Sequence, residues 1–275
     1  MSEYSLDVLM TTHNRLDLTM ASVKALYDCT ARPFHLIVVD DSTDLTPLYF
    51  ADLQQEHDNI TYIHSDIPYE SGNQIFNIGL AQTKTPYTAI VMNSVRVEPE
   101  WDIQPIQVFI EQPKIGVLAL KNLFPDGSIE SAGIALGDSE KVDFGRFKEI
   151  STHIPVDMFT GQPGHRAGLI YECYSAQWAF VLLRREAVPV LEEDVYHGFK
   201  GWDDIDNTLI MKKNGWDVFY CGGSAGYHQP RATRGDDSLE GAKLNMDNAV
   251  NFFKRWGLWK GEPDEGVAYS TIPEV

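Results

Sequence analysis

The chain has 275 residues, of which 43% are hydrophobic, and 40 acidic against 22 basic side chains give it a formal net charge of −18. This length and apolar content are sufficient for one large globular domain. The acidic excess argues against binding to unmodified duplex nucleic acid or to anionic lipid, because both are bound through clusters of Lys and Arg.

Apolar content and cysteine spacing bear on the cellular setting. No segment approaches eighteen consecutive apolar residues, and the first residues lack the basic and apolar regions of a signal peptide. The sequence therefore predicts a cytoplasmic protein without a transmembrane segment. Cys29, Cys173 and Cys221 are widely separated and lack metal-ligand spacing, so we expect buried thiols. No pattern indicates an oligomeric state.

Strand and helix patterns alternate in the first 120 residues. Apolar runs predict strands over residues 6–11, 34–39, 60–63 and 87–92. Apolar residues at helical spacing predict helices over residues 16–27, 47–55 and 73–81. This alternation is typical of βαβ units and predicts a mostly parallel sheet.

The pattern after residue 120 is less regular. We expect glycine-rich irregular strands up to Phe147 and a loop from His153 to Gly168, which prolines and glycines interrupt. A strand over residues 177–183 and a helix over residues 205–213 follow, and a short strand comes after Gly215.

Two acidic clusters are candidates for site chemistry. Asp40 and Asp41 directly follow an apolar strand, at the end where open α/β sheets bind ligands. Asp203, Asp204 and Asp206 lie at the start of a predicted helix, and His228 follows about twenty residues later. Acidic residues at a helix start also interact favourably with the helix dipole, so a capping role stays open for them. A structural role stays open for His228.

Five motifs in order along the chain resemble those of family 2 glycosyltransferases. They are Thr11-Thr12-His13-Asn14-Arg15, Val38 to Asp44, Asn73 to Gly79, Pro125 to Gly133, and Asp203-Asp204-Ile205-Asp206. The resemblance runs from about residue 6 to Phe253-Lys254-Arg255-Trp256-Gly257, and it is strongest to the rhamnosyltransferase-like branch that includes capsule and O-antigen enzymes.

The resemblance implies a single α/β domain with the GT-A fold of nucleotide-diphospho-sugar transferases. In that fold a mostly parallel central sheet is flanked by helices, with a smaller mixed β region on the acceptor side. We expect a nucleotide-sugar-binding half over residues 1–120, an acceptor and catalytic half over 121–257, and a C-terminal tail over 258–275.

The resemblance also implies an activity. An inverting enzyme would move a sugar from a nucleotide-diphosphate sugar to a hydroxyl of a glycan, a lipid-linked sugar, a small molecule or a modified base. Asp204, or alternatively Asp203, would be the general base, because a positioned carboxylate can accept the hydroxyl proton. Asp206 would orient or cap.

Further site residues follow from the same comparison of motifs. Trp178 and Trp202 are candidates for stacking on an acceptor sugar, although indoles at these positions also suit the core. Arg231 and Arg234 would clamp the diphosphate, since Arg forks match phosphate oxygens. The full set expected to bind the donor is Thr12, Asn14, Arg15, Asp40, Asp41, Asn73, Asn77, Asn93, Ser94, Arg231 and Arg234.

One family feature is missing. Relatives carry an acidic triplet after the fourth strand, whose last carboxylate holds a divalent cation, whereas this chain has Met92-Asn93-Ser94. Mn²⁺ and Mg²⁺ prefer anionic oxygen ligands. Three alternatives follow: a weak metal site at Ser94 and His228 completed by substrate phosphates, metal-free catalysis in which Arg96, Arg231 or Arg234 neutralises the leaving group, or a protein that binds nucleotide or glycan without transfer. The retained aspartate cluster favours an enzyme.

Overall fold

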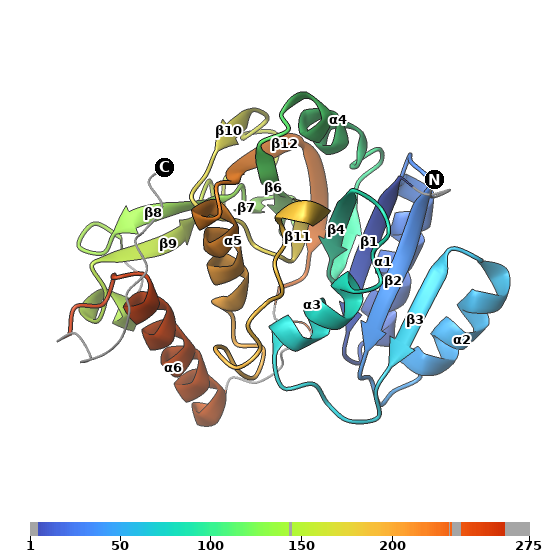
Figure 1. The fold of residues 1–275 in the computed structure, drawn as a ribbon, viewed down its shortest axis with the longest axis horizontal. Helices are drawn as coiled ribbons and strands as arrows, with labels where there is room; N and C mark the ends of the chain where they lie inside the picture. The colour runs from blue at the N-terminus through green and yellow to red at the C-terminus, as the bar shows by residue number, and fades with distance from the viewer. Residues whose placement is uncertain (1–4, 143–144, 231, 233–237, 262–275) are drawn as a thin grey trace.

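The computed structural model describes residues 5–142, 145–230, 232 and 238–261 and has an α/β fold (Figure 1). Its N-terminal part alternates strands and helices as predicted. The elements are β1 (Leu6–Thr12), α1 (Leu16–Cys29), β2 (Phe34–Asp40), α2 (Thr46–Glu56), β3 (Ile60–His64), α3 (Gly72–Leu80) and β4 (Tyr87–Val91). β1 pairs in parallel with β2 and β4, and β2 pairs in parallel with β3. The predicted parallel block is confirmed.

The second part adds antiparallel strands and two long helices. Its elements are β5 (Val95–Val97), α4 (Ile103–Glu111), β6 (Ile115–Leu123), β7 (Ile129–Ser131), β8 (Ile134–Asp138), η1 (Gly145–Glu149), β9 (His153–Asp157), β10 (Ile170–Glu172), β11 (Phe180–Arg184), η2 (Arg185–Ala187), α5 (Asp203–Lys213), β12 (Asp217–His228) and α6 (Leu239–Arg255). The main sheet has the order β10-β12-β6-β11-β4-β1-β2-β3, with β5 beside β12 and β7 beside β6.

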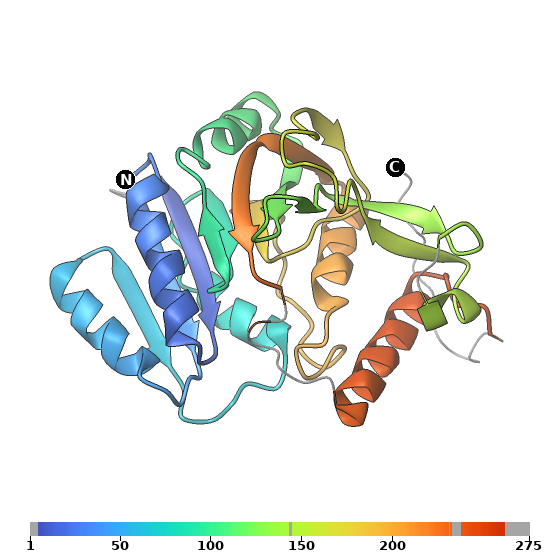
Figure 2. The ribbon, with the colours of Figure 1, turned by 180° about the vertical axis from the view of Figure 1, so that it is seen from behind.

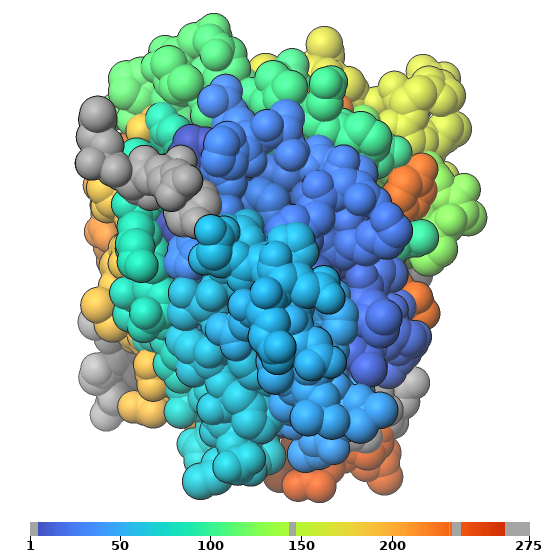
Figure 3. All heavy atoms as spheres, turned by 90° about the vertical axis from the view of Figure 1, so that its right-hand side faces the viewer, coloured from blue at the N-terminus to red at the C-terminus, as the bar shows by residue number. Residues whose placement is uncertain are grey.

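The sheet is buried on both faces. All seven residues of β1 and of β2 are buried, which explains why these strands are mostly apolar. Core side chains of α1, α2 and α4 pack in one cluster, and those of α3 and α5 pack in another. Figure 1 shows α3 and α5 in front of the sheet, and the opposite view in Figure 2 shows α1 in front of it. Figure 3 shows that the N-terminal elements, in blue and cyan, form the β3 side of the molecule.

A third apolar cluster holds α6 against α5 and the β8–β9 pair. Here one expectation is wrong: residues 153–157 form β9 rather than loop, because they pair antiparallel with β8 and bury Ile154 completely. Pro155 is tolerated because this sheet has only two strands, so no interior ladder needs its missing N–H. The expected strand over 177–183 begins only at Phe180, and the short strand after Gly215 extends to His228.

Two further findings concern the cysteines and the membrane. Cys173 and Cys221 are buried free thiols as expected, whereas Cys29 is half-buried. Burial raises the pKa of the Cys173 thiol to about 12. Within the described ranges, no helix is long and apolar enough to cross a membrane.

Candidate active site

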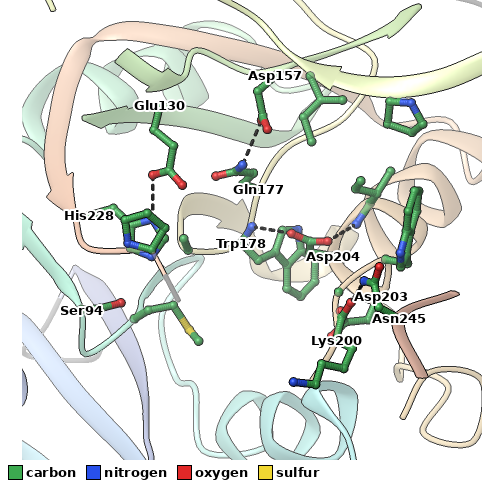
Figure 4. Close-up of a pocket in the computed structure, with 18 of the residues that line it drawn as sticks. Ser94, Glu130, Asp157, Gln177, Trp178, Lys200, Asp203, Asp204, His228 and Asn245 are labelled. Atoms are coloured by element: carbon green, nitrogen blue, oxygen red, sulfur yellow. Dashed lines mark hydrogen bonds and ion pairs between the residues drawn. The ribbon is translucent and has the colours of Figure 1, made fainter. Parts of the chain in front are cut away.

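Two adjoining cavities lie at the carboxyl ends of the parallel strands. The β1–β2 cavity, of about 470 Å³, is lined by Thr12, His13, Asp41, Tyr69 and Asn93, and by residues of the 198–200 segment and of α6. The α5 cavity, of about 370 Å³, is lined by Ser94, Glu130, Asp157, Gln177, Trp178, Asp203, Asp204 and His228 (Figure 4). Met92 and Lys200 line both cavities, which therefore adjoin.

The two aspartates after β2 have different surroundings. Asp40 is fully buried and accepts hydrogen bonds from Thr12 Oγ1 (2.6 Å) and Tyr62 OH (2.7 Å), as well as from the backbone and hydroxyl of Ser42. His64 Nδ1 lies 2.9 Å from its second oxygen. Asp41 instead lines the β1–β2 cavity, held by the Tyr69 N–H (3.0 Å) with His13 Nδ1 at 2.8 Å. Only Asp41 of the pair is placed to contact a ligand.

In the turn after β1, His13 lines the β1–β2 cavity, whereas Asn14 and Arg15 line neither cavity. Asn14 Oδ1 accepts from the backbone N–H groups of Thr43 (2.8 Å) and Asp44 (3.1 Å), so it fixes the loop after β2. The Arg15 guanidinium forks onto Asp17 and donates to the Ala232 carbonyl (2.9 Å). Both predicted donor-binding residues therefore hold loops rather than face either cavity.

Asn73 and Asn77 on α3 also hold the fold together. The side-chain amides of Asn73 and of Asn207, on α5, hydrogen-bond to each other, and Asn207 Nδ2 donates to Asn73 Oδ1 (2.7 Å). Asn77 pairs with the backbone of Leu191 in both directions, at 2.9 Å each way. Neither is among the residues that line the two cavities, and their amides bind the chain's own groups, so donor binding by Asn73 and Asn77 stays a prediction.

The segment after β4 contributes to both cavities, since Met92 lines both and the next two residues line one each. Asn93 is buried, donates to Thr19 Oγ1 (3.1 Å) and lines the β1–β2 cavity, whereas Ser94 lines the α5 cavity. The Gln229 N–H donates to the Ser94 carbonyl (3.0 Å), and β5 pairs with the end of β12. This pairing brings His228 to the same part of the α5 cavity as Ser94, as Figure 4 shows.

The aspartates at the start of α5 divide between the cavity and the core. Asp204 is half-buried and lines the cavity, and its carboxylate accepts from the N–H groups of Trp178 (3.3 Å) and Ile205 (2.9 Å) (Figure 4). Asp203 also lines the cavity but is more buried and packs against Gly72, where an added Cβ would lie 2.3 Å from its Oδ2.

Asp206 points away from the cavity. It accepts from Trp256 Nε1 (2.6 Å) and lies 3.2 Å from Arg255 Nε, so it joins α5 to α6. Burial raises its pKa to about 6, although Arg255 opposes the rise. Among the three predicted catalytic residues, Asp206 is the one that does not line the α5 cavity, and its contacts to α6 are compatible with the expected orienting role.

Both tryptophans contribute walls that are largely buried. Trp178 Nε1 donates to Thr208 Oγ1 (3.0 Å), and only 2% of Trp178 is exposed. The Trp202 ring packs against Phe147, Phe252 and Phe253 in the third apolar cluster. Both line the α5 cavity, with 2% of Trp178 and 9% of Trp202 exposed, so little of either ring is accessible for stacking on a sugar.

The structure reveals two carboxylates that the sequence analysis did not select. Glu130, on β7, lies with Oε2 2.7 Å from Nδ1 of His228, and both side chains are mostly buried. Asp157, at the end of β9, accepts from Gln177 Nε2 (2.9 Å). Glu130 stands inside the quoted motif from Pro125 to Gly133 and could have been chosen there, whereas Asp157 falls in the segment expected to be loop.

The structure describes the residues expected to bind a metal, but not the two arginines expected to bind the diphosphate. Within the described ranges no cluster of three His, Cys, Asp or Glu side chains could hold a metal ion. His228 and Ser94 offer one imidazole nitrogen and one hydroxyl, which fits a weak site alone. Arg231 and Arg234 lie outside the described residues.

Comparison with solved structures identifies the fold. The fold matches GalNAc-T7 with UDP, GalNAc and Mn²⁺, with a TM-score of 0.66 and 12% identity over 92% of this chain and 49% of that one. It also matches residues 1–349 of TarS from S. aureus in complex with UDP-GlcNAc, with a TM-score of 0.58 and 15% identity over 94% of this chain and 68% of that one. The chain has the GT-A fold.

Sequence comparison gives the family. A model of glycosyl transferase family 2 matches residues 7–163, more than half of the chain, which therefore belongs to that family. The chain is also 25% identical over 278 residues to the uncharacterized protein y4gI of Sinorhizobium fredii (strain NBRC 101917 / NGR234). The alignment covers 96% of this chain and 28% of y4gI, so the chain spans about a quarter of that relative.

The environment of Asp157 predicts a dependence of stability on pH. Burial raises its pKa from 3.8 to about 6, and the neighbouring Glu130 carboxylate adds to the rise. Between these two pKa values, the folded chain keeps a proton that the unfolded chain has already released. As the pH rises through this range, the Asp157 carboxyl group therefore lowers the free energy of unfolding.

Asp157→Asn removes this titration while keeping the oxygen that accepts from Gln177. Relative to the wild type, the variant should gain about 1–3 kcal/mol in free energy of unfolding between about pH 4 and about pH 7. Urea unfolding of both proteins at several pH values measures the difference. If the free energies of unfolding of the two proteins differ by a constant amount across this pH range, the raised pKa of Asp157 is contradicted.

Proposed function

We propose that this chain is an inverting glycosyltransferase that moves a sugar from a nucleoside-diphosphate sugar to an acceptor hydroxyl. The observation that carries the proposal is the junction of two cavities, one with Asp41 at a strand end and the other with the half-buried carboxylate of Asp204. Membership of glycosyl transferase family 2 supports it. So do the UDP and UDP-GlcNAc present in the structural neighbours.

The β1–β2 cavity would hold the nucleoside. Asp41 would accept hydrogen bonds from a base N–H or a ribose hydroxyl, since its carboxylate lines the cavity while the Tyr69 N–H fixes its orientation. Thr12, Asn93 and the ring of Tyr69 complete the wall. The diphosphate would then extend towards Met92 and Lys200, where the second cavity begins.

The α5 cavity would hold the reacting groups. Asp204 accepts the proton of the acceptor hydroxyl as the hydroxyl oxygen attacks the anomeric carbon. The bond from that carbon to the diphosphate oxygen breaks, and its electron pair stays on the leaving diphosphate. Attack from the side opposite the diphosphate inverts the anomeric centre. Asp204 suits this role better than Asp203, because it is more exposed to the cavity and Asp203 packs against Gly72.

The Met92-Asn93-Ser94 segment is read as an altered form of the family's acidic triplet. A bound Mn²⁺ or Mg²⁺ would add positive charge at the leaving diphosphate. His228 would be its protein ligand through Nε2, because Nδ1 faces Glu130, and Ser94 would add a weak neutral oxygen. The missing carboxylate at Ser94 also keeps open a second candidate function, binding of nucleotide or glycan without transfer.

The first test concerns the general base. Asp204→Asn should leave the dissociation constant of the donor within about twofold and lower turnover by about 100-fold or more, because only the proton acceptor is lost. Turnover and calorimetric donor binding measure the two effects. Asp203→Asn is the matched control, and a larger loss there would transfer the role to Asp203. Equal losses of affinity and turnover in Asp204→Asn would indicate a structural role instead.

The second test separates the two aspartates after β2. Asp41→Ala should weaken nucleotide binding by about 1–3 kcal/mol, since a donor group of the nucleoside is left unpaired. Asp40→Ala should instead lower the free energy of unfolding by about 2–4 kcal/mol, because several buried donors lose their acceptor. Calorimetry and urea unfolding of both variants measure the split. Unchanged affinity in Asp41→Ala would remove the proposed donor site.

The third test concerns the metal. Without nucleotide, Mn²⁺ should bind weakly, and Ser94→Asp should tighten its binding in the presence of UDP by about tenfold or more by adding an anionic oxygen. Ser94→Asn, neutral and similar in size to the aspartate, should not. Titration calorimetry with Mn²⁺ measures both variants. Tight binding of Mn²⁺ to the free wild-type protein, with activity abolished by chelator, would mean that another carboxylate holds the metal.

A further inference from the structure

Lys200 occupies the junction of the two cavities. It and Met92 are the residues that line both, and Met92 directly precedes Asn93 and Ser94. In Figure 4 the Lys200 side chain extends from the Asp203 side of the α5 cavity towards the side that bears Ser94. A donor that reaches from the β1–β2 cavity into the α5 cavity must pass this side chain.

The charges around the junction are otherwise negative. Carboxylates lining the two cavities are Asp41, Glu130, Asp157, Asp203, Asp204 and Glu240. Within the described part of the chain, Lys200 is the sole Lys or Arg that lines either cavity. A diphosphate entering such surroundings is repelled by the carboxylates unless a cation lies beside it, and the attraction is strongest where water is excluded.

The backbone around Lys200 is held in an uncommon conformation. Gly198, Phe199, Gly201 and Trp202 all have positive φ, at 65°, 54°, 81° and 80°. For Phe199 and Trp202 this conformation is unfavourable and persists only where the surrounding structure imposes it. Helix α6 supplies that restraint.

Two asparagines of α6 hold this segment in place. Asn245 donates to the Lys200 carbonyl, and Asn248 donates to the His197 carbonyl (3.0 Å) while accepting from the His197 N–H (3.2 Å). The carbonyl of Lys200 is thus fixed to the helix, and its side chain lines the junction of the two cavities. Restraint of this kind at a site favours a functional position for the residue it carries.

We propose that Lys200 is a catalytic residue that binds the donor diphosphate and neutralises it as it leaves. The inference rests on the proposed function. The ammonium donates to phosphate oxygens, and as the anomeric C–O bond breaks its positive charge stabilises the electron pair left on the diphosphate. Because Ser94 supplies no carboxylate for a metal, Lys200 carries a larger share of this stabilisation than metal binding does.

The test measures the affinity for nucleosides with and without their phosphates. UDP, GDP and dTDP, and uridine, guanosine and thymidine, are titrated by calorimetry in the presence of EDTA. Lys200→Met keeps the length of the side chain and removes its charge. It should weaken binding of the diphosphate that the wild type recognises by about tenfold or more and leave the matching nucleoside unchanged.

Two further variants complete the design. Lys200→Arg should recover most of the affinity, because the positive charge is restored. Lys243 is exposed on α6 and lines neither cavity, so Lys243→Met should change neither affinity, although it alters the net charge equally. Should Lys200→Met fail to fold, Lys200→Gln is measured in the same way.

The outcomes separate this inference from the proposed function. Unchanged diphosphate affinity in Lys200→Met, or an equal loss for nucleoside and diphosphate, overturns the role of Lys200 while the donor site stands. Failure of the wild type to bind any of the three diphosphates overturns the proposed function and this inference with it. A tenfold loss confined to the diphosphate, with recovery in Lys200→Arg, supports both.

Discussion

The geometry of the site depends on the buried carboxylate of Asp40. Thr12 on β1, the Ser42 turn, and Tyr62 and His64 on β3 all direct polar groups to it, so it ties together the ends of three neighbouring strands. A buried carboxylate without partners is strongly destabilising, and the strand ends are therefore fixed around it. Since successive residues of an extended chain point to opposite sides, this anchoring turns Asp41 into the β1–β2 cavity.

A similar arrangement recurs across the cleft. Asp206 receives Trp256 Nε1 and faces Arg255, which fixes α6 against α5, and Asp204 of the same helical turn is thereby presented to the α5 cavity. With α6 in place, Asn245 reaches the Lys200 carbonyl and holds the junction between the cavities. On each side one carboxylate holds elements of the fold together, and another carboxylate one or two residues away in the sequence lines a cavity.

The sequence predicted elements well where patterns are local and poorly where contacts are distant. β1 to β4 follow from apolar runs alone, whereas β9 exists because of its pairing with β8, which its prolines and glycines conceal. The acidic motifs pointed to residues that line the two cavities, but not to which member of each motif does so: Asp40 and Asp41 look equivalent until the hydrogen-bond donors on β3 are known. Asn77 shows the same limit, because its partner Leu191 lies 114 residues away.

The structure shows where part of the excess of acidic side chains lies. Asp7 and Asp102, like Asp40, are fully buried and accept from backbone N–H groups, so part of the acidic excess is structural and never reaches the surface. Another part lines the two cavities, where it would repel the anionic donor. Under the proposed function, an acidic cleft that binds a diphosphate needs a cation at the point where the phosphates lie, and Lys200 lines the junction through which they would pass.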